Sequence, residues 1–343
     1  MKIAFFSTNQ SFCGDVIADL SAHHELRNWK YTGDKNQDIP NMVGLINWCD
    51  LVYCDFIQYP APWITKQQWL DKPVVMRMDG IDILNHVAVD WRKVSALVLM
   101  PVQKKRLQRL RTLQTAKGNR LPNLPSKILE MNIGVDLTLF QPLNKTPGYE
   151  IVYHSNVMRE VKKPYIILQS FKELIDRDPE NPWRLTMLGQ WEGGWDWKNR
   201  VEYVMCLREL LEDLDIPEDR ITLRDNLSRQ LWAQTLPGFD IIWSYSHREG
   251  FPNSVGEGAS AGVYPIMNSF YGAELIYPEK YRVRSPMQLV EKTVAWGALS
   301  DEEKQVESKA ARKHISQYDR FETARRIRLL CEEVIDDSIR GPR

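Results

Sequence analysis

Residues 239–268 read FDIIWSYSHREGFPNSVGEGASAGVYPIMN, and this stretch decides the fold. Two apolar runs, 239–246 and 262–268, stand on either side of a polar loop and a short segment of small residues. The runs are apolar without strict alternation, which is typical of strands that are buried on both faces of a parallel sheet. The stretch therefore predicts a strand, a loop, a short helix and a second parallel strand.

The same alternation of strands and helices extends through the rest of the chain. Further apolar runs predict strands at 2–7, 49–56, 72–80, 94–100, 149–155, 183–189 and 220–223. Helical spacing marks 14–26, 163–178, 200–216 and 301–337. This alternation predicts an α/β fold with open parallel sheets. A chain of 343 residues suits two such domains, and the Pro- and Gly-containing segment 140–150 is the expected linker, near residue 145.

Composition limits the classes of partner. Lys plus Arg equals Asp plus Glu at 45 each, so the net charge does not favour a nucleic-acid or membrane partner. The five cysteines show no C-x-x-C spacing, so neither a zinc site nor a disulfide framework is favoured. The N-terminal apolar run is too short for a secretory signal, and no run approaches the roughly 18–20 residues that span a bilayer. We therefore expect a cytoplasmic protein.

Two carboxylates stand eight residues apart in the opening stretch, Glu249 in the loop and Glu257 in the small-residue segment. Ser254 and Glu257 have the spacing of a capping box, for a helix over 254–261 that ends at Gly262. Such a helix is weak by propensity, and its N-terminus suits a phosphate that approaches the backbone closely. From the residues alone, Glu257 is a cap or a ligand, and Glu249 is a solvated acid or a ligand.

The segment EGFPNSVGEGASAGVYPI resembles the Glu-x7-Glu signature of retaining glycosyltransferases of the GT-B fold, specifically family four. Four further segments are similar to motifs of that family, in its order along the chain: KPVVMRMDG (72–80), NIGVDLTLFQP (132–142), HSNVMREVKKPYIILQSF (154–171) and WRLTMLGQ (183–190). The resemblance runs from about residue 72 to the C-terminus.

The resemblance implies two Rossmann-like, doubly wound domains with an interdomain cleft. Residues 1–145 form the acceptor side, and residues 146–317 form the nucleotide-sugar donor side. The C-terminal helix, at about 318–337, packs back on the first domain. The implied reaction is transfer of a hexose or pentose from a nucleotide-diphosphate sugar to a hydroxyl group, with retention and without a metal cofactor. The acceptor is a glycan, a lipid-linked compound or another alcohol.

The first domain departs from the family pattern at two places. Met78-Asp79-Gly80 stands where the family usually has a histidine, and the first glycine loop keeps one glycine, Gly14. Asp79 orients an acceptor hydroxyl or the sugar in one interpretation, and is a helix N-cap or turn residue in the other. Gly14 lets the first loop approach the phosphates, or is an ordinary helix start. The donor side is thus better supported than the acceptor side.

The second domain supplies the expected phosphate cations. Arg159 and Lys162 follow a predicted strand and suit a diphosphate, with Lys163 as a close rival for Lys162. The family's basic residue is displaced, because Val157 stands at its place and Arg159 comes two residues later. The alternative is that this loop is simply a solvated basic segment.

By resemblance, Glu257 holds the ribose hydroxyls and Glu249 holds hydroxyls of the transferred sugar. We do not expect Glu249 to be a nucleophile, since retaining glycosidases use two carboxylates about 5–5.5 Å apart across the sugar ring. In the family, transfer is thought to occur on one face, with the leaving phosphate helping to deprotonate the acceptor. The loop and helix start between the glutamates add candidate phosphate contacts, with no backbone donor at the proline: Phe251, Pro252, Asn253 and Ser254.

Residues 104–127 hold eight basic residues and no acid, with leucines at helical spacing. This segment is an ordinary solvated helix, or it contacts an anionic membrane or a polyanion, for example at the inner membrane face. Two alternatives to this glycosyltransferase stay open at this point. One is a non-catalytic nucleotide-sugar or glycan-binding protein on the same scaffold. The other is a transferase that modifies nucleic acid.

Overall fold

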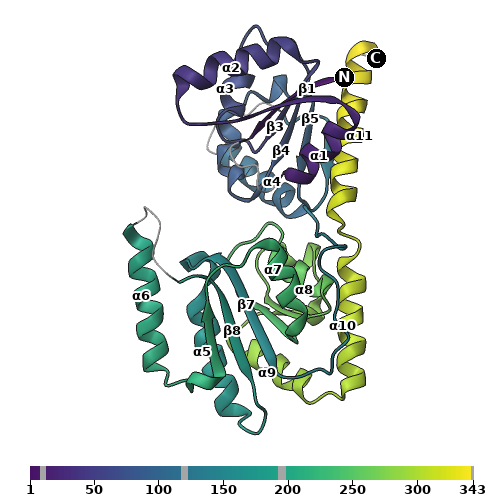
Figure 1. The fold of residues 1–343 in the computed structure, drawn as a ribbon. Coiled ribbons are helices and arrows are strands. Elements are labelled where there is room, and N and C mark those ends of the chain that lie inside the picture. The colour runs from purple at the N-terminus through teal and green to yellow at the C-terminus, as the bar shows by residue number, and fades with distance from the viewer. Residues whose placement is uncertain (8–12, 117–122, 192–197, 341–343) are drawn as a thin grey trace. The chain divides into compact units, whose positions relative to one another are not determined.

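A computed structural model gives the fold of the chain and describes all residues except 8–12, 117–122, 192–197 and 341–343 (Figure 1). The chain forms two compact units: Met1–Gly134 with Arg320–Arg343, here the N-terminal unit, and Val135–Asp319, the C-terminal unit. The division precedes the linker expected near residue 145. Residues after 135 pack within the C-terminal unit, where Phe140 is fully buried and its carbonyl accepts a hydrogen bond from Ser260 Oγ at 2.8 Å.

The N-terminal unit is built on a six-stranded sheet in the order β2-β1-β3-β4-β5-β6. Every neighbouring pair is parallel. The order changes direction between β1 and β3, which is the switch point of a doubly wound sheet. The strands are β1 (Lys2–Ser7), β2 (Glu25–Lys30), β3 (Leu51–Asp55), β4 (Val74–Met78), β5 (Ala96–Leu99) and β6 (Lys127–Glu130).

Alternate residues of these strands enter two separate hydrophobic cores, as the period of two of a strand requires. Ile3 and Phe5 face a core that α1 and α11 complete, whereas Ala4 and Phe6 face a core that α2 and α4 complete. Helix α11 thus belongs to the N-terminal unit, where it packs against α1. The helices are α1 (Gly14–His23), α2 (Lys35–Trp48), α3 (Ala61–Thr65), α4 (Pro101–Ala116) and α11 (Arg320–Arg340).

The C-terminal unit has a second parallel sheet, in the order β12-β11-β10-β7-β8-β9, with its switch point between β7 and β10. Helix α5 packs against α9, and α8 packs against α10. The strands are β7 (Glu150–Val157), β8 (Arg184–Gln190), β9 (Ile221–Arg224), β10 (Ile241–Ser244), β11 (Tyr264–Asn268) and β12 (Arg282–Val283). The helices are α5 (Pro164–Arg177), α6 (Lys198–Asp213), α7 (Arg229–Thr235), α8 (Asn253–Ser260), α9 (Pro286–Gly297) and α10 (Asp301–Ile315).

These two sheets confirm the predicted α/β class with two doubly wound units. Three strands that the sequence did not predict, β2, β6 and β12, all lie at sheet edges. Strand β2 reads ELRNWK and is largely exposed, so it carries no apolar run. An edge strand has a neighbour on one side only and needs less apolar surface, which removes the signal by which a buried strand is recognised.

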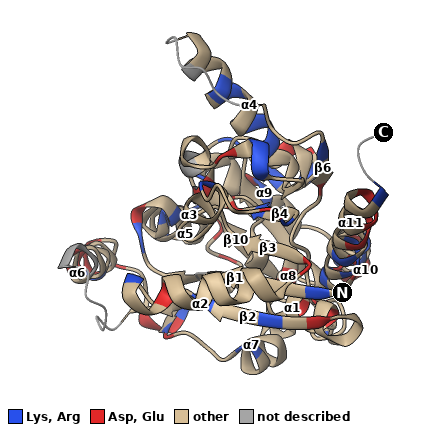
Figure 2. Ribbon diagram, turned by 90° about the horizontal axis from the view of Figure 1, so that it is seen from above, with Lys and Arg blue, Asp and Glu red and all other residues tan. Residues whose placement is uncertain are grey.

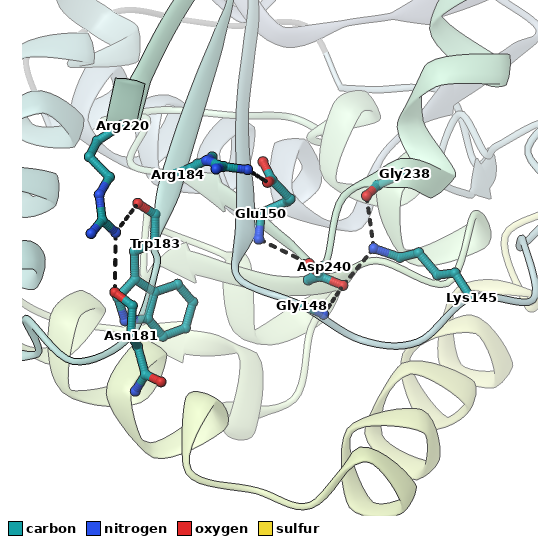
Figure 3. A network of polar contacts seen from close by, with 9 residues as sticks. All are labelled: Lys145, Gly148, Glu150, Asn181, Trp183, Arg184, Arg220, Gly238 and Asp240. Carbon is teal, nitrogen blue, oxygen red and sulfur yellow. Dashed lines mark hydrogen bonds and ion pairs between the residues drawn. The ribbon is translucent and has the colours of Figure 1, made fainter. Parts of the chain in front are cut away.

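A polar network closes the amino edge of the second sheet (Figure 3). The Asp240 carboxylate, just before β10, accepts hydrogen bonds from the backbone N–H groups of Gly148 at 3.0 Å and Glu150 at 2.9 Å. Lys145 Nζ lies 2.6 Å from the same carboxylate. Asp240 therefore ties the chain segment that enters β7 to the start of β10.

Candidate functional site

The carboxyl ends of β7 and β10 bring two of the predicted site residues together. Ligands of open α/β sheets bind at this edge, at the switch point. Lys162 follows β7 and Glu249 follows β10, and Lys162 Nζ lies 2.5 Å from Glu249 Oε1. The lysine side chain is 25% exposed and the glutamate side chain 12% exposed, so the ion pair is only partly open to water.

The loop after β7 has an unusual backbone at Lys163. This residue adopts φ 48°, in the left-handed region, directly before Pro164 starts α5. A side chain is disfavoured in that region of backbone conformation. The Lys163 ammonium lies 6.0 Å from the centroid of the Tyr245 ring. Arg159 precedes the short 3₁₀ helix Glu160–Lys162 and is exposed.

The predicted capping box in the small-residue helix is wrong. Helix α8 begins at Asn253, one residue earlier than expected, after Pro252, and no side chain caps it. Ser254 Oγ instead donates to the His154 carbonyl at 3.5 Å, and Glu257 makes no cap. The helix ends before Gly262, which has the expected left-handed φ of 81°.

The glycines of α8 have a packing function. A Cβ at Gly256 would lie 2.7 Å from Val135 Cγ2, and one at Gly258 would lie 2.8 Å from Ile242 Cγ2. Neither distance allows a side chain without movement of the neighbours. The interpretation that small residues thin this helix for an approaching ligand is therefore incomplete, because close packing inside the C-terminal unit already requires these glycines.

Glu257 is buried at 8% exposure and is held by two side chains of α7. The Trp232 indole Nε1–H donates to Glu257 Oε2 at 2.9 Å, and Arg229 Nη1 lies 3.4 Å from Oε1. Arg229 and Trp232 are three residues apart and therefore share one face of the helix. Neither residue is predicted from the sequence, since nothing in their spacing indicates contact with a helix that begins some 20 residues later.

His154, in β7, lies against this group. Its ring centroid is 4.7 Å from that of Trp232, with an angle of 33° between the planes. Burial, together with the charge of Lys162, lowers the pKa of His154 to about 4, so the imidazole is neutral near pH 7. Two buried polar atoms here, His154 Nδ1 and Asn253 Oδ1, have no hydrogen-bond partner among the described residues. Buried polar atoms are usually paired, so these two are candidates for ligand contacts.

Phe251 and Pro252, which lead into α8, are both buried. The Phe251 ring packs edge-on against Tyr318, with the centroids 5.6 Å apart. These contacts fix the backbone at the start of the helix. Contact of either residue with a phosphate stays a prediction.

In the N-terminal unit, Asp79 acts as a helix cap. Its carboxylate accepts from the Gly80 N–H at 2.5 Å, and it forms a reciprocal capping box with Asp82 at the start of the 3₁₀ helix Gly80–Ala88. Burial raises the pKa of Asp82 to about 6. Of the two interpretations of Asp79, the structure shows the N-cap, and its role toward an acceptor stays a prediction. Gly14 is the first residue of α1, and a Cβ there would meet no described heavy atom within 4 Å.

The first part of the basic segment 104–127 lies in α4 and its last residue, Lys127, starts β6, whereas residues 117–122 lie outside the described residues. Figure 2 shows Lys and Arg residues along α4. Two of its lysines have acidic partners: Lys104 pairs with Glu130, and Lys127 Nζ lies 2.6 Å from both Glu333 and Asp337 of α11. This pairing offsets part of the positive charge, and a contact with a membrane or polyanion stays a prediction.

The described residues contain neither a membrane-spanning helix nor a metal-binding cluster. No described helix is long and apolar enough to cross a bilayer. Nor do three or more His, Cys, Asp or Glu side chains within the described ranges form a group that could hold a metal ion.

Solved structures with the same architecture are known. A sucrose-phosphate synthase from Thermosynechococcus elongatus matches with a TM-score of 0.75 at 12% identity, over 98% of this chain and 99% of that chain. A UDP-forming α,α-trehalose-phosphate synthase from Burkholderia xenovorans matches with a TM-score of 0.74 at 9% identity, over 98% of this chain and 99% of that chain. The pneumococcal O-GlcNAc transferase GtfA, in complex with UDP and GlcNAc, matches with a TM-score of 0.61 at 15% identity, over 84% and 57%.

No protein-family model matches the chain, and no curated protein matches its sequence. At identities this low, the structural matches establish the fold. The chain therefore has the GT-B architecture of two Rossmann-like α/β units.

Proposed function

We propose that this protein is a retaining glycosyltransferase that moves a sugar from a nucleotide-diphosphate sugar to a hydroxyl acceptor. The observation that carries the proposal is the meeting of Lys162 and Glu249, at 2.5 Å, at the switch point of the C-terminal unit. The second glutamate of the motif, Glu257, lies in the helix that follows. The names of the matched structures support the same chemistry, since one is a UDP-forming synthase and another binds UDP and GlcNAc.

The donor diphosphate needs positive charge, and the loop after β7 supplies it. Arg159, Lys162 and Lys163 are three cations within five residues. The first N–H groups of α8 add donors, because the N-terminal turn of a helix leaves them without intrahelical acceptors. In this proposal, these groups neutralise the diphosphate, so a metal ion is not required. Turnover that is unchanged by EDTA would support this assignment.

The two glutamates divide the hydroxyl groups of the donor between them. Glu257 accepts hydrogen bonds from the ribose hydroxyls, and Glu249 accepts them from the transferred sugar. A carboxylate oxygen accepts more than one hydrogen bond, so in this proposal the ribose hydroxyls bind beside the contacts of Glu257 with α7. Lys162 and Glu249 hold each other when no ligand is present, and the donor replaces that contact with phosphate on Lys162 and sugar on Glu249.

In the reaction, the bond between the anomeric carbon and the phosphate oxygen breaks, and a bond from the acceptor oxygen to that carbon forms on the same face. The acceptor proton goes to the leaving phosphate. Negative charge grows on that phosphate in the transition state, and preorganised cations stabilise it. Lys162 and Arg159 are the residues proposed for this stabilisation.

A thermal-shift panel of UDP-, GDP-, ADP- and dTDP-sugars tests the proposal, because a ligand that binds the folded state raises the melting temperature. We expect one base to stabilise the protein, and Glu257→Ala to abolish the shift for free nucleotides and donors alike. Glu249→Ala should keep the shift with the free nucleotide and lose turnover. If no nucleotide shifts the wild type, or if both variants behave like it, the site assignment is wrong.

One observation favours a second candidate, a non-catalytic nucleotide-sugar-binding protein. Asp79, at the position where the glycosyltransferase motif has its acceptor-side residues, is engaged as a helix cap. Donor binding without transfer and without slow donor hydrolysis would favour this candidate over the enzyme.

A further inference from the structure

The hydrogen bond between Trp232 and Glu257 joins two buried groups. Trp232 is 4% exposed, and its Nε1–H donates to Glu257 Oε2 at 2.9 Å. A hydrogen bond to a charged acceptor is stronger than one between neutral groups, and water competes little for it in the interior. This bond therefore fixes one of the two carboxylate oxygens.

The indole that makes this bond is itself held in place. Ser228 caps α7, with its Oγ accepting from the Leu231 N–H at 3.3 Å, so the start of the helix is defined. The neutral ring of His154 lies against the Trp232 ring, with 4.7 Å between centroids. Strand β7, which carries His154, is central in the sheet. The N–H direction is thus set by a helix cap and by the sheet.

The second oxygen of Glu257 has a different kind of partner. Arg229 Nη1 lies 3.4 Å from Oε1, a longer distance than that of the indole bond, and the Arg229 side chain is 44% exposed. An ion pair with an exposed arginine contributes little, because water screens it. The same guanidinium also lies 5.3 Å from the centroid of the Phe140 ring. Of these two contacts, the indole bond to Oε2 is therefore the shorter and the more buried.

We infer that Trp232 is a positioning residue for nucleotide binding, whose N–H orients Glu257 to receive the ribose 2′- and 3′-hydroxyls. This role rests on the proposed function, because it takes Glu257 as the ribose ligand. Trp232 acts through Glu257 and does not itself contact the nucleotide. Its loss therefore affects only that part of the affinity which the hydroxyls supply.

Because the effect is limited to the ribose hydroxyls, it can be distinguished from general damage to the fold, which would weaken binding of every nucleotide. The dissociation constants of UDP, GDP and ADP, and of their 2′,3′-dideoxy forms, are measured by calorimetry for wild type and Trp232→Phe. We expect Trp232→Phe to weaken the ribonucleotide about 10-fold or more, as loss of a hydrogen bond to a charged group does. The dideoxy form should bind both proteins equally, because it has no hydroxyls for Glu257 to accept.

Trp243→Phe is the matched control. Trp243 is also buried in the C-terminal unit, and its Nε1–H donates to Thr293 Oγ1 at 3.1 Å. This variant loses a comparable indole hydrogen bond and should keep the wild-type preference for the ribonucleotide. Trp232→His, which retains an N–H donor in a smaller ring, should keep more of that preference than Trp232→Phe, and it supplies the comparison if the phenylalanine variant does not fold.

The outcomes separate the two proposals. A wild type that binds none of the three diphosphates overturns the proposed function and, with it, the role of Trp232. If Trp232→Phe keeps the wild-type preference for the ribonucleotide over the dideoxynucleotide, the positioning role of Trp232 is wrong and the proposed function still stands. An equal loss for ribonucleotide and dideoxynucleotide also overturns the positioning role, because it indicates disturbance of the whole site. The role of the N–H is also contradicted if Trp232→His prefers the ribonucleotide over the dideoxynucleotide no more than Trp232→Phe does.

Discussion

The acidic residues at the two edges of the second sheet have different kinds of hydrogen-bond partner. At the amino edge, the Asp240 carboxylate is paired with two backbone N–H groups and with Lys145 (Figure 3). At the carboxyl edge, Glu249 and Glu257 are paired with side chains of other elements. Two buried polar atoms there, on His154 and Asn253, have no partner among the described residues.

This difference separates a structural network from the proposed ligand site. Backbone donors are fixed by the fold, so a carboxylate that they satisfy is committed to stability. Long side chains can exchange one partner for another. A ligand that forms a hydrogen bond to an unpaired buried atom removes the free-energy cost of leaving that atom unpaired. The carboxyl edge is also where a parallel sheet of this kind binds ligands. Substitutions at the two edges should therefore affect different measurements.

The largest effect is expected for Lys162→Ala. If Lys162 stabilises the leaving phosphate, its loss should lower kcat/KM by about 10²–10³-fold, the range found on removing a preorganised transition-state donor. The value of kcat/KM is measured for donor hydrolysis or transfer by monitoring release of the nucleotide diphosphate. Lys172→Ala is the control, since Lys172 pairs with Asp176 on the surface of α5. Activity within tenfold of wild type in Lys162→Ala would contradict the role of the cation.

The opposite pattern is expected for Asp240→Ala at the amino edge. Removal of this buried carboxylate leaves two N–H groups without their acceptor and Lys145 with only the Gly238 carbonyl, and should lower the free energy of unfolding by about 3 kcal/mol. Denaturation by urea measures it, and the nucleotide dissociation constant should not change. Glu150→Gln is the control, because the Glu150–Arg184 pair in the same network is more exposed and contributes under about 1 kcal/mol. A parallel loss of nucleotide affinity in Asp240→Ala would remove the distinction between the edges.

How far the sequence predicts this molecule depends on the kind of signal. Central strands such as β4 and β10 are buried on both faces and consist mostly of apolar residues, so their runs are recognised without the structure. The edge strand β2 has polar residues and gives no such signal: the helical spacing over 14–26 reaches only its first two residues, and no element is predicted for the other four. The meeting of Lys162 and Glu249 follows from topology, because both stand after strands at the switch point, and the family resemblance pointed to both.

Other contacts depend on geometry that a sequence does not contain. The contact of Trp232 with Glu257 needs the relative rotation of α7 and α8. The capping box predicted at Ser254 is wrong because α8 starts at Asn253, after Pro252, so Ser254 lies inside the first turn and not at the cap. Asp79 matched a motif position, but local hydrogen bonds to Gly80 and Asp82 decide what its carboxylate does.

A smaller effect than those of Lys162→Ala and Asp240→Ala is expected from His154, whose titration makes the stability depend on pH. Its pKa is about 4 in the folded protein and 6.5 when unperturbed, so the unfolded state binds the proton more readily. The unfolding free energy must therefore fall as the pH drops below 6.5, and level off below about 4. Between pH 7 and pH 5, wild type should lose about 2 kcal/mol more than His154→Gln, which does not titrate. Urea denaturation at both values measures the difference, and equal losses in the two proteins would show that His154 is not buried as a neutral group.

The smallest effect, at Lys163, compares strain with function within the carboxyl edge. Lys163→Gly removes a side chain from the left-handed region and should raise the free energy of unfolding by up to about 1 kcal/mol, because the residue no longer has a strained Cβ. The same change removes a cation beside Lys162, so affinity for the nucleotide diphosphate should fall severalfold. Asp215→Gly is the matched control, since Asp215 also has φ 48° and lies after α6, outside the proposed site. It should give the stability gain with unchanged affinity. Equal affinities in both variants would mean that Lys163 is a strained loop residue without a role in binding, and that Lys162 and Arg159 alone supply the phosphate charge.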